Sequence, residues 1–216
     1  MVAALQHTVD SSTLGQRDFE QVDDLLSLAP GQVAGLSGIP GSGLTRIGLS
    51  LLAPYAVRGP VVYLDVRGWA NPSAAWEMGI PHDRLVVVRS SDVVSWGRIV
   101  ATLLDGARGV YAEVPTGLRD QALYKLAAKA RARRTPLVLR PIAGKLPSGV
   151  AHLQLEAREV LWEGVEAGHG NLTKRRILLV ASGKATRGMR RMIEVEDDGT
   201  NDLRVVSHMG AKASTA

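Results

Sequence analysis

The chain contains no cysteine, which excludes a disulfide framework, thiolate zinc sites and a cysteine nucleophile. No apolar run approaches the roughly 18 residues that a membrane-spanning helix needs, and no basic start followed by an apolar stretch marks a signal peptide. The five histidines are scattered without metal-ligand spacing, and no serine lies in a nucleophile-elbow pattern. These absences predict a soluble cytoplasmic protein that has no metal site and does not bind a membrane.

The composition that is present suits one sizeable globular domain. Hydrophobic residues make up 45% of 216 residues, enough for a full core. The net charge is +5, from 26 Lys and Arg against 21 Asp and Glu. A basic balance is a weak indication of nucleic-acid binding. The arginine-rich composition of proteins from high-GC genomes would explain it equally well.

A glycine-rich stretch near the start, VAGLSGIPGSGLTRIGLSLL (33–52), reads as a buried strand, a turn and a helix. Its spacing is that of a phosphate-binding loop, G-x-x-x-x-G-K-[ST]. Gly38 and Gly43 occupy the two glycine positions, with Gly41 between them, and Thr45 occupies the hydroxyl position. The bland alternative is an ordinary glycine-rich turn between a strand and a helix.

The lysine position of this loop is Leu44. A lysine there would reach the β- and γ-phosphates and offset the charge that moves during hydrolysis. Leucine cannot, and it would place an apolar side chain beside a bound polyanion. The loop is therefore a candidate nucleotide site that has lost its chemistry. Arg46 carries charge nearby, but its Cβ is expected to point elsewhere on the helix.

Short apolar runs alternate with helical segments along the next hundred residues. We predict buried strands at 33–36, 61–66, 84–89, 109–114 and 136–141, with helices at 45–52, 73–78, 93–106 and 118–134. Such alternation predicts an α/β fold with a mostly parallel sheet and helices on both faces. After Pro147 the sequence alternates apolar and polar residues, which predicts C-terminal antiparallel strands with a hairpin turn at 165–172.

The order of these elements resembles the core of the RecA family of bacterial recombinases over most of the chain. VVYLDVRGWANPSAAWEMGIPHDRLVVV is similar to the family's second strand, turn, helix and third strand, and GVYAEV is similar to its Walker B strand. HLQLEAR, KRRILLVASGK and MRRMIEV resemble its three closing antiparallel strands. The resemblance implies a RecA-like P-loop core at 29–208, after an N-terminal arm and short helix at 1–28 and before a disordered tail at 209–216.

The resemblance also assigns positions to a degenerate nucleotide site. The family's catalytic glutamate falls on Arg67, which stays protonated and cannot act as a base. The Walker B aspartate falls on Glu113, which could orient a magnesium ion through water or simply cap the next helix. Lys184 matches a lysine that reaches nucleotide across a subunit interface. With Leu44 and Arg67 in place, the resemblance implies no catalysis and no cofactor.

A short RecA-like chain with lost catalysis resembles the ImuA/SulA-like accessory proteins, in particular their ImuA-type branch. This resemblance implies a non-enzymatic scaffold in SOS mutagenesis and translesion synthesis. Its expected partners are an ImuB-like, Y-family-like polymerase homologue, RecA and DNA. The alternative is a divergent DNA-dependent ATPase that uses ATP and magnesium, with Arg46 or Lys184 replacing the missing lysine. A third reading is a regulator that binds nucleotide without turnover.

Basic residues mark the candidates for DNA contact. Lys145 lies in a shortened loop, PIAGKLPSG, at the position of the family's second DNA loop. The predicted antiparallel region adds Lys174, Arg175, Arg176, Arg187, Arg190 and Arg191 beside Lys184. This number of cations is larger than a solubilising face requires. We therefore expect some of them to contact a polyanion such as DNA.

Overall fold

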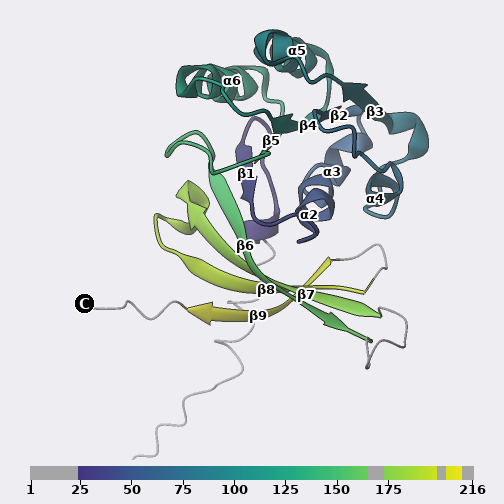
Figure 1. The fold of residues 1–216 in the computed structure, drawn as a ribbon, viewed down its shortest axis with the longest axis vertical. Helices are drawn as coiled ribbons and strands as arrows, with labels where there is room; N and C mark the ends of the chain where they lie inside the picture. The colour runs from purple at the N-terminus through teal and green to yellow at the C-terminus, as the bar shows by residue number, and fades with distance from the viewer. Residues whose placement is uncertain (1–23, 165–172, 199–202, 211–216) are drawn as a thin grey trace, which may run out of the picture.

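The fold is described from a computed structural model, which covers residues 24–164, 173–198 and 203–210, with the side chains of 207–210 left out. Nine strands form a single sheet in the order β3-β2-β4-β5-β1-β6-β7-β8-β9 (Figure 1). The strands are β1 Val33–Ser37, β2 Val61–Asp65, β3 Leu85–Arg89, β4 Gly109–Val114, β5 Leu137–Pro141, β6 Leu153–Glu163, β7 Lys174–Gly183, β8 Arg191–Asp197 and β9 Leu203–Gly210.

The sheet has a parallel half and an antiparallel half. Neighbouring strands from β3 to β6 pair in parallel, and β6 continues the parallel half beside β1. From β6 onward each new neighbour, β7, β8 and then β9, is antiparallel. Because β6 belongs to both halves, the closing hairpin strands extend the parallel sheet and do not form a separate domain.

Helices cover both faces of the parallel half. α2 Leu44–Ser50, α3 Ala53–Ala56 and α4 Ser73–Trp76 lie on one face, whereas α5 Val93–Gly106 and α6 Asp120–Arg133 lie on the other (Figure 1). Short 3-10 turns occur at Asp24–Leu26, His82–Arg84 and Lys184–Thr186. The side chain of Asp92 caps α5 by accepting from the backbone N–H groups of Val94 and Ser95 at 2.9 and 3.2 Å.

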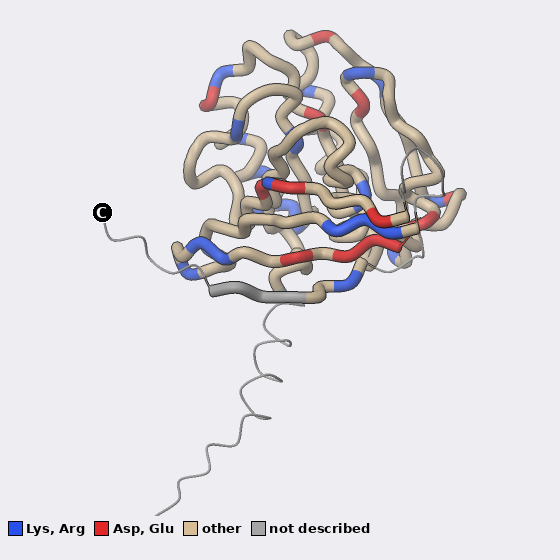
Figure 2. Tube along the Cα trace, turned by 60° about the horizontal axis from the view of Figure 1, so that its bottom comes forward, with Lys and Arg blue, Asp and Glu red and all other residues tan. Residues whose placement is uncertain are grey.

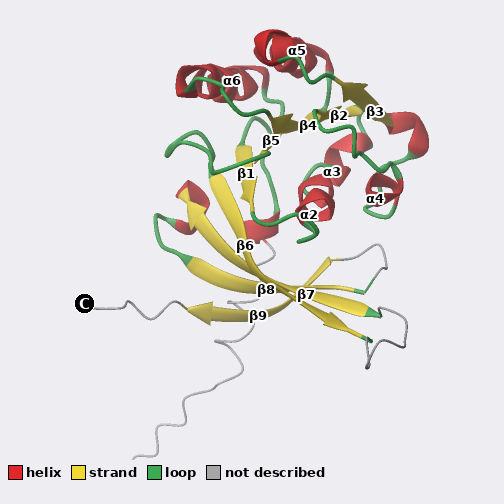
Figure 3. Cartoon of the chain, in the orientation of Figure 1, coloured by secondary structure: helices red, strands yellow, loops and turns green. Residues whose placement is uncertain are grey.

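Each face of the sheet has its own apolar core. Tyr63 and Tyr111 point toward α2, and their strand neighbours Leu64 and Val110 point toward α5 and α6. The first core continues under the antiparallel half through Leu155, Ile177 and Ile193, among others. The antiparallel strands extend beyond the helices (Figure 3), so their other face keeps partly exposed side chains. The predicted α/β class, with a mostly parallel sheet and antiparallel strands at its end, is confirmed.

Several local expectations need correction. β3 is an edge strand paired only with β2, and Val86 is 43% exposed, so the prediction of a buried strand was wrong there. A run of valines looks the same at an edge and in the centre of a sheet. The helix expected at 45–52 is α2, Leu44–Ser50, and the unpredicted short helix α3 follows it with Pro54 in its first turn.

The C-terminal part contains more order than the sequence predicts. β9 is a fourth closing strand, and it continues to Gly210, past the expected boundary at 208. The arm at 1–23, the turn at 165–172 and residues 211–216 lie outside the described residues. In the described part, no helix has both the length and the apolar character to cross a membrane.

Candidate functional site

The glycine-rich loop joins β1 to α2 where the sequence predicts it. Gly38 and Gly43 have φ values of 152° and 76°, which glycine adopts most easily. A Cβ on Gly38 would lie 2.8 Å from the Cβ of Ala157, and one on Gly43 would lie 2.7 Å from Cδ1 of Ile177. The loop therefore needs these glycines because it packs closely against β6 and β7.

Leu44 does not face the space beside the loop. Its side chain is 1% exposed and belongs to the apolar core, beside Gly38. The expectation of an apolar side chain next to a bound polyanion is therefore wrong. As the first residue of α2, Leu44 turns toward the sheet, where burying its apolar surface is favourable.

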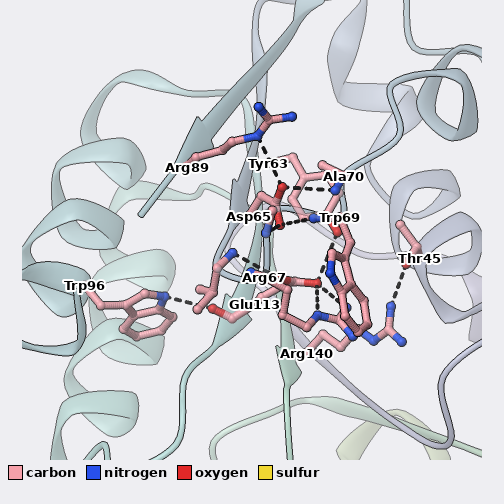
Figure 4. Close-up of polar contacts among 12 residues, drawn as sticks. Thr45, Tyr63, Asp65, Arg67, Trp69, Ala70, Arg89, Trp96, Glu113 and Arg140 are labelled. Atoms are coloured by element: carbon pink, nitrogen blue, oxygen red, sulfur yellow. Dashed lines mark hydrogen bonds and ion pairs between the residues drawn. The ribbon is translucent and has the colours of Figure 1, made fainter. Parts of the chain in front are cut away.

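Glu113, at the C-terminal end of β4, is fully buried and accepts hydrogen bonds from several donors (Figure 4). One carboxylate oxygen accepts from the backbone N–H groups of Val66 and Arg67, at 3.0 and 3.1 Å. The other accepts from Tyr63 at 3.3 Å and from two nitrogens of the Arg67 guanidinium, Nε at 3.0 Å and Nη2. Both oxygens are thus occupied by protein donors, and Glu113 fastens the end of β2 to β4.

Arg67, which stands at the expected position of a catalytic glutamate, is the ion-pair partner of Glu113. The hydrogen bond to Glu113 raises the pKa of the Arg67 guanidinium above its ordinary value, against the opposing effect of burial. The guanidinium also lies over the ring of Trp69, 4.7 Å from its centroid. In place of a base that activates water, the site therefore contains a fixed cation. Within the described residues, no cluster of three His, Cys, Asp or Glu side chains could hold a metal.

Arg140, at the end of β5, brings a second cation to the same place. Its Nη1 donates to Oγ1 of Thr45 at 2.6 Å (Figure 4). Thr45 occupies the position whose hydroxyl binds magnesium in a phosphate-binding loop. Here that hydroxyl is held by a guanidinium. Burial raises the pKa of Tyr63 and of Tyr111 behind it, so both phenols stay protonated.

Asp65 shapes the turn that presents Arg67 and Trp69. Its carboxylate accepts from the backbone N–H groups of Gly68, Trp69 and Ala70 at 2.8, 3.1 and 3.0 Å. Arg89 from β3 lies 3.6 Å away. On the other side of β4, the buried Trp96 donates from Nε1 to the carbonyl oxygen of Glu113 at 2.8 Å. These contacts hold the ends of three parallel strands in one arrangement.

The strand ends and the loop enclose a cavity of about 300 Å³. Its lining includes Gly41, Thr45, Tyr63, Arg67, Trp69 and Arg140. The structure thus brings together Arg67 and two of the predicted loop residues, Gly41 and Thr45, whereas Gly38, Gly43, Leu44 and Glu113 do not line the cavity. It adds Arg140, Tyr63 and Trp69, which the sequence analysis did not assign. A signal existed for Arg140, because it ends a buried strand, and ligands bind beyond the carboxyl ends of parallel strands.

Two predicted cations lie away from this cavity. Arg46 pairs with Glu77 of α4 and with Asp197 of β8, where Nε lies 3.0 Å from Oδ2. Lys184 lies beside Gln32 and His152, at the start of β1 and β6, whereas the loop follows the end of β1. The five residues of β1 span about 16 Å, so the end of the sheet near Lys184 lies about that far from the loop. Within one chain, neither side chain lines the cavity in front of the loop.

The cations proposed for DNA contact form two groups with different partners. In the first group, Lys174, Arg175 and Arg176 pair across strands with Glu196, Asp197, Glu163 and Glu194. Figure 2 shows these basic and acidic segments side by side along β7 and β8. Lys145 pairs likewise with Glu156 at 2.8 Å. Their charge is mostly offset locally.

The second group lies around the turn between β7 and β8. It contains Lys184, Arg187, Arg190 and Arg191, and no carboxylate among the described residues forms an ion pair with them. Arg187 and Arg191 line a cavity of about 470 Å³ together with Gln32 and His152. At this end of the sheet, the charge of these four cations is therefore not offset by ion pairs within the described residues.

The comparison with protein families decides the membership of the chain. The family described as the MT3502 N-terminal domain matches residues 26–144, more than half of the 216 residues. The chain belongs to this family. The MT3502 N-terminal domain region contains the strands β1 to β5 and the cavity, and it ends before the strand β6. A search of curated proteins found no match.

Proposed function

We propose that this chain is a catalytically inactive RecA-like accessory protein of DNA damage tolerance. It acts in SOS mutagenesis and translesion synthesis as a cytoplasmic scaffold. Its partners are an ImuB-like, Y-family-like polymerase homologue and RecA, which it holds near DNA. The mechanism is mass action: a bound partner stays at high local concentration beside the DNA.

Support for a RecA-like core comes from the order of elements. A strand, glycine-rich loop and helix begin the domain, parallel strands with helices on both faces follow, and antiparallel strands extend the same sheet. This is the arrangement that the sequence resemblance implies. The glycine loop lies at the carboxyl ends of the parallel strands, where ligands bind in such sheets.

The observation that carries the inactive assignment is the pairing of Arg67 with Glu113. Hydrolysis needs a base that accepts a proton from water, and a guanidinium cannot do this. The carboxylate that would orient magnesium already accepts hydrogen bonds at both oxygens. Both groups that the resemblance assigns to catalysis therefore stabilise each other, and the site lacks a base.

The alternative is a divergent DNA-dependent ATPase with a substitute cation. Arg46 is an unfavourable substitute because it pairs with Glu77 and Asp197. Lys184 lies at the opposite end of β1, so it could serve a nucleotide only on a neighbouring subunit. Neither replaces the missing base, so the accessory role is favoured.

The proposed DNA surface is the second basic group, Lys184, Arg187, Arg190 and Arg191. Phosphates attract cations whose charge is not offset, and each contact releases counterions and adds salt dependence. Lys145, Lys174, Arg175 and Arg176 are less suitable because acidic partners already hold them.

The test is phosphate release from ATP and magnesium by the purified full chain, with and without single-stranded DNA. We expect release no faster than in a protein-free control under both conditions. DNA-stimulated release would contradict the proposal and favour the ATPase. The partner assignment is tested by co-purification of the full chain with an ImuB-like polymerase homologue. Failure of a stable complex to form, while both proteins are folded, would contradict the scaffold.

A further inference from the structure

Arg140 is a buried cation that has no ion-pair partner among the described residues. The residue is 8% exposed, and its guanidinium donates to the neutral hydroxyl of Thr45 at 2.6 Å. Among the residues that the structure describes, no carboxylate forms an ion pair with it. Burying a guanidinium without a negative partner is unfavourable, because the charge loses its hydration and gains no counter-charge.

The carboxylates that lie near Arg140 are already engaged. Glu113, its neighbour across β4 and β5, receives the Arg67 guanidinium and two backbone N–H groups. Asp65 receives three backbone N–H groups at the turn after β2. Neither of these carboxylates is therefore left free to pair with Arg140.

The cavity in front of Arg140 provides donors for an oxyanion. Arg67 and Arg140 both line it, with Thr45, whose hydroxyl proton can point to a ligand, and with Tyr63 and the backbone of Gly41. Trp69 forms a wall that is 69% exposed, with its ring under Arg67. Planar guanidinium groups bind phosphate oxygens through paired hydrogen bonds, and an exposed indole ring stacks on a nucleobase.

We propose that this cavity binds a phosphate group, either free or on a mononucleotide, without a divalent cation. Arg140 supplies the positive charge that magnesium provides in an intact phosphate-binding loop, and its hydrogen bond to Thr45 occupies the metal's hydroxyl ligand. The site therefore differs from the magnesium-dependent site of an intact phosphate-binding loop. It requires no turnover, and it stands whether or not the chain acts in DNA damage tolerance.

The direct test is calorimetric titration of the full chain with inorganic phosphate, AMP and ATP, each in EDTA and in magnesium. We expect binding in EDTA that is no weaker than in magnesium. Equal affinity for phosphate and AMP would identify free phosphate as the ligand. Tighter binding of AMP or ATP would identify a nucleotide. Binding only with magnesium, or no binding of any of the three, would overturn the proposal.

Arg140→Met tests the residue itself, because methionine retains an unbranched apolar stem without the charge. We expect at least about tenfold weaker binding of the best ligand, since charge-assisted hydrogen bonds are lost. The ligand-dependent rise in unfolding temperature should disappear, while the ligand-free unfolding temperature stays the same or increases. Arg98→Met, on the exposed side of α5, is the matched control and should bind as the unmodified chain does.

Arg140→Lys is the second variant if the methionine protein does not fold. It keeps the charge but loses the planar pair of donors, so its affinity should fall between those of the other two proteins. Unchanged affinity in both Arg140 variants would overturn the assignment of Arg140 as the principal cation.

Discussion

Two regions of this sheet are rich in charged side chains, and they use them differently. At the carboxyl ends of the parallel strands, Arg67 and Glu113 form a pair in which the carboxylate is fully buried. Along β7 and β8, Lys174 and Arg176 form cross-strand pairs that are partly open to water (Figure 2). The first arrangement fixes strand ends in one geometry, whereas the second mainly offsets charge on a wet face. Burial, more than the number of pairs, decides what an ion pair contributes.

The largest effect should follow from Arg67→Met in the buried region. Glu113 would keep its backbone donors but lose its only cation, so we expect the free energy of unfolding to fall by about 3–5 kcal/mol. Urea denaturation measures it. Adding Glu113→Gln should restore part of the loss, because the uncompensated charge disappears. If the free energy of unfolding falls less in Arg67→Met than in the exposed control Arg98→Met, the pair does not stabilise the fold.

The two basic groups should differ in binding to single-stranded DNA. Replacing Arg187, Arg190 and Arg191 by Gln should weaken binding and reduce the slope of log affinity against log salt by about 2, since each lost contact on a single strand contributes about 0.7. The control replaces Lys174 and Arg176 by Gln and should leave the slope nearly unchanged, because these cations have acidic partners. Equal losses in both variants would show that local pairing does not decide the DNA surface.

Within the buried region, Trp96→Phe should lower the free energy of unfolding by about 1–3 kcal/mol. The substitution removes the donor to the Glu113 carbonyl oxygen from a side chain that is 0% exposed. Trp69→Phe is the matched comparison, and at 69% exposure it should change stability by less than about 0.5 kcal/mol. Thermal and urea unfolding of both proteins measure the difference.

The smallest effect belongs to the exposed pair of Lys145 and Glu156. The hydrogen bond from Lys145 lowers the pKa of Glu156. The stabilisation of the fold by this hydrogen bond is therefore fully present above the unfolded-state pKa of glutamate. It is lost as the pH falls through the lower folded-state pKa of Glu156. Lys145→Met should cost at most about 0.5 kcal/mol at neutral pH and almost nothing below about pH 3. Lys125→Met, on an exposed part of α6, should show no such pH dependence.

Local sequence signals predicted much of the fold. The apolar runs placed β1, β2, β4 and β5 within one or two residues, because a strand buried on both faces has few polar residues. The bounds of α5 were predicted correctly, since Asp92 caps its start and Gly106 ends it. β9, with the eight residues LRVVSHMG, was not predicted.

The site was predicted only in part. The glycine spacing indicated the loop, and the resemblance placed Arg67 and Glu113 at its strand ends. Their hydrogen bonds join residues 46 positions apart, and that between Arg140 and Thr45 joins residues 95 positions apart. No local pattern encodes a contact at such a separation.

The sequence alone therefore determined the alternating elements, the glycine loop and the presence of Arg67 at the position where the resemblance expects a catalytic base. It could do so because apolar periodicity, glycine spacing and residue type are local properties. Only the tertiary structure decided that Leu44 turns into the core, that β3 lies at an edge and that Arg140 reaches Thr45. Those outcomes depend on which strands become neighbours, and that choice follows from burying one apolar core on each face of the sheet.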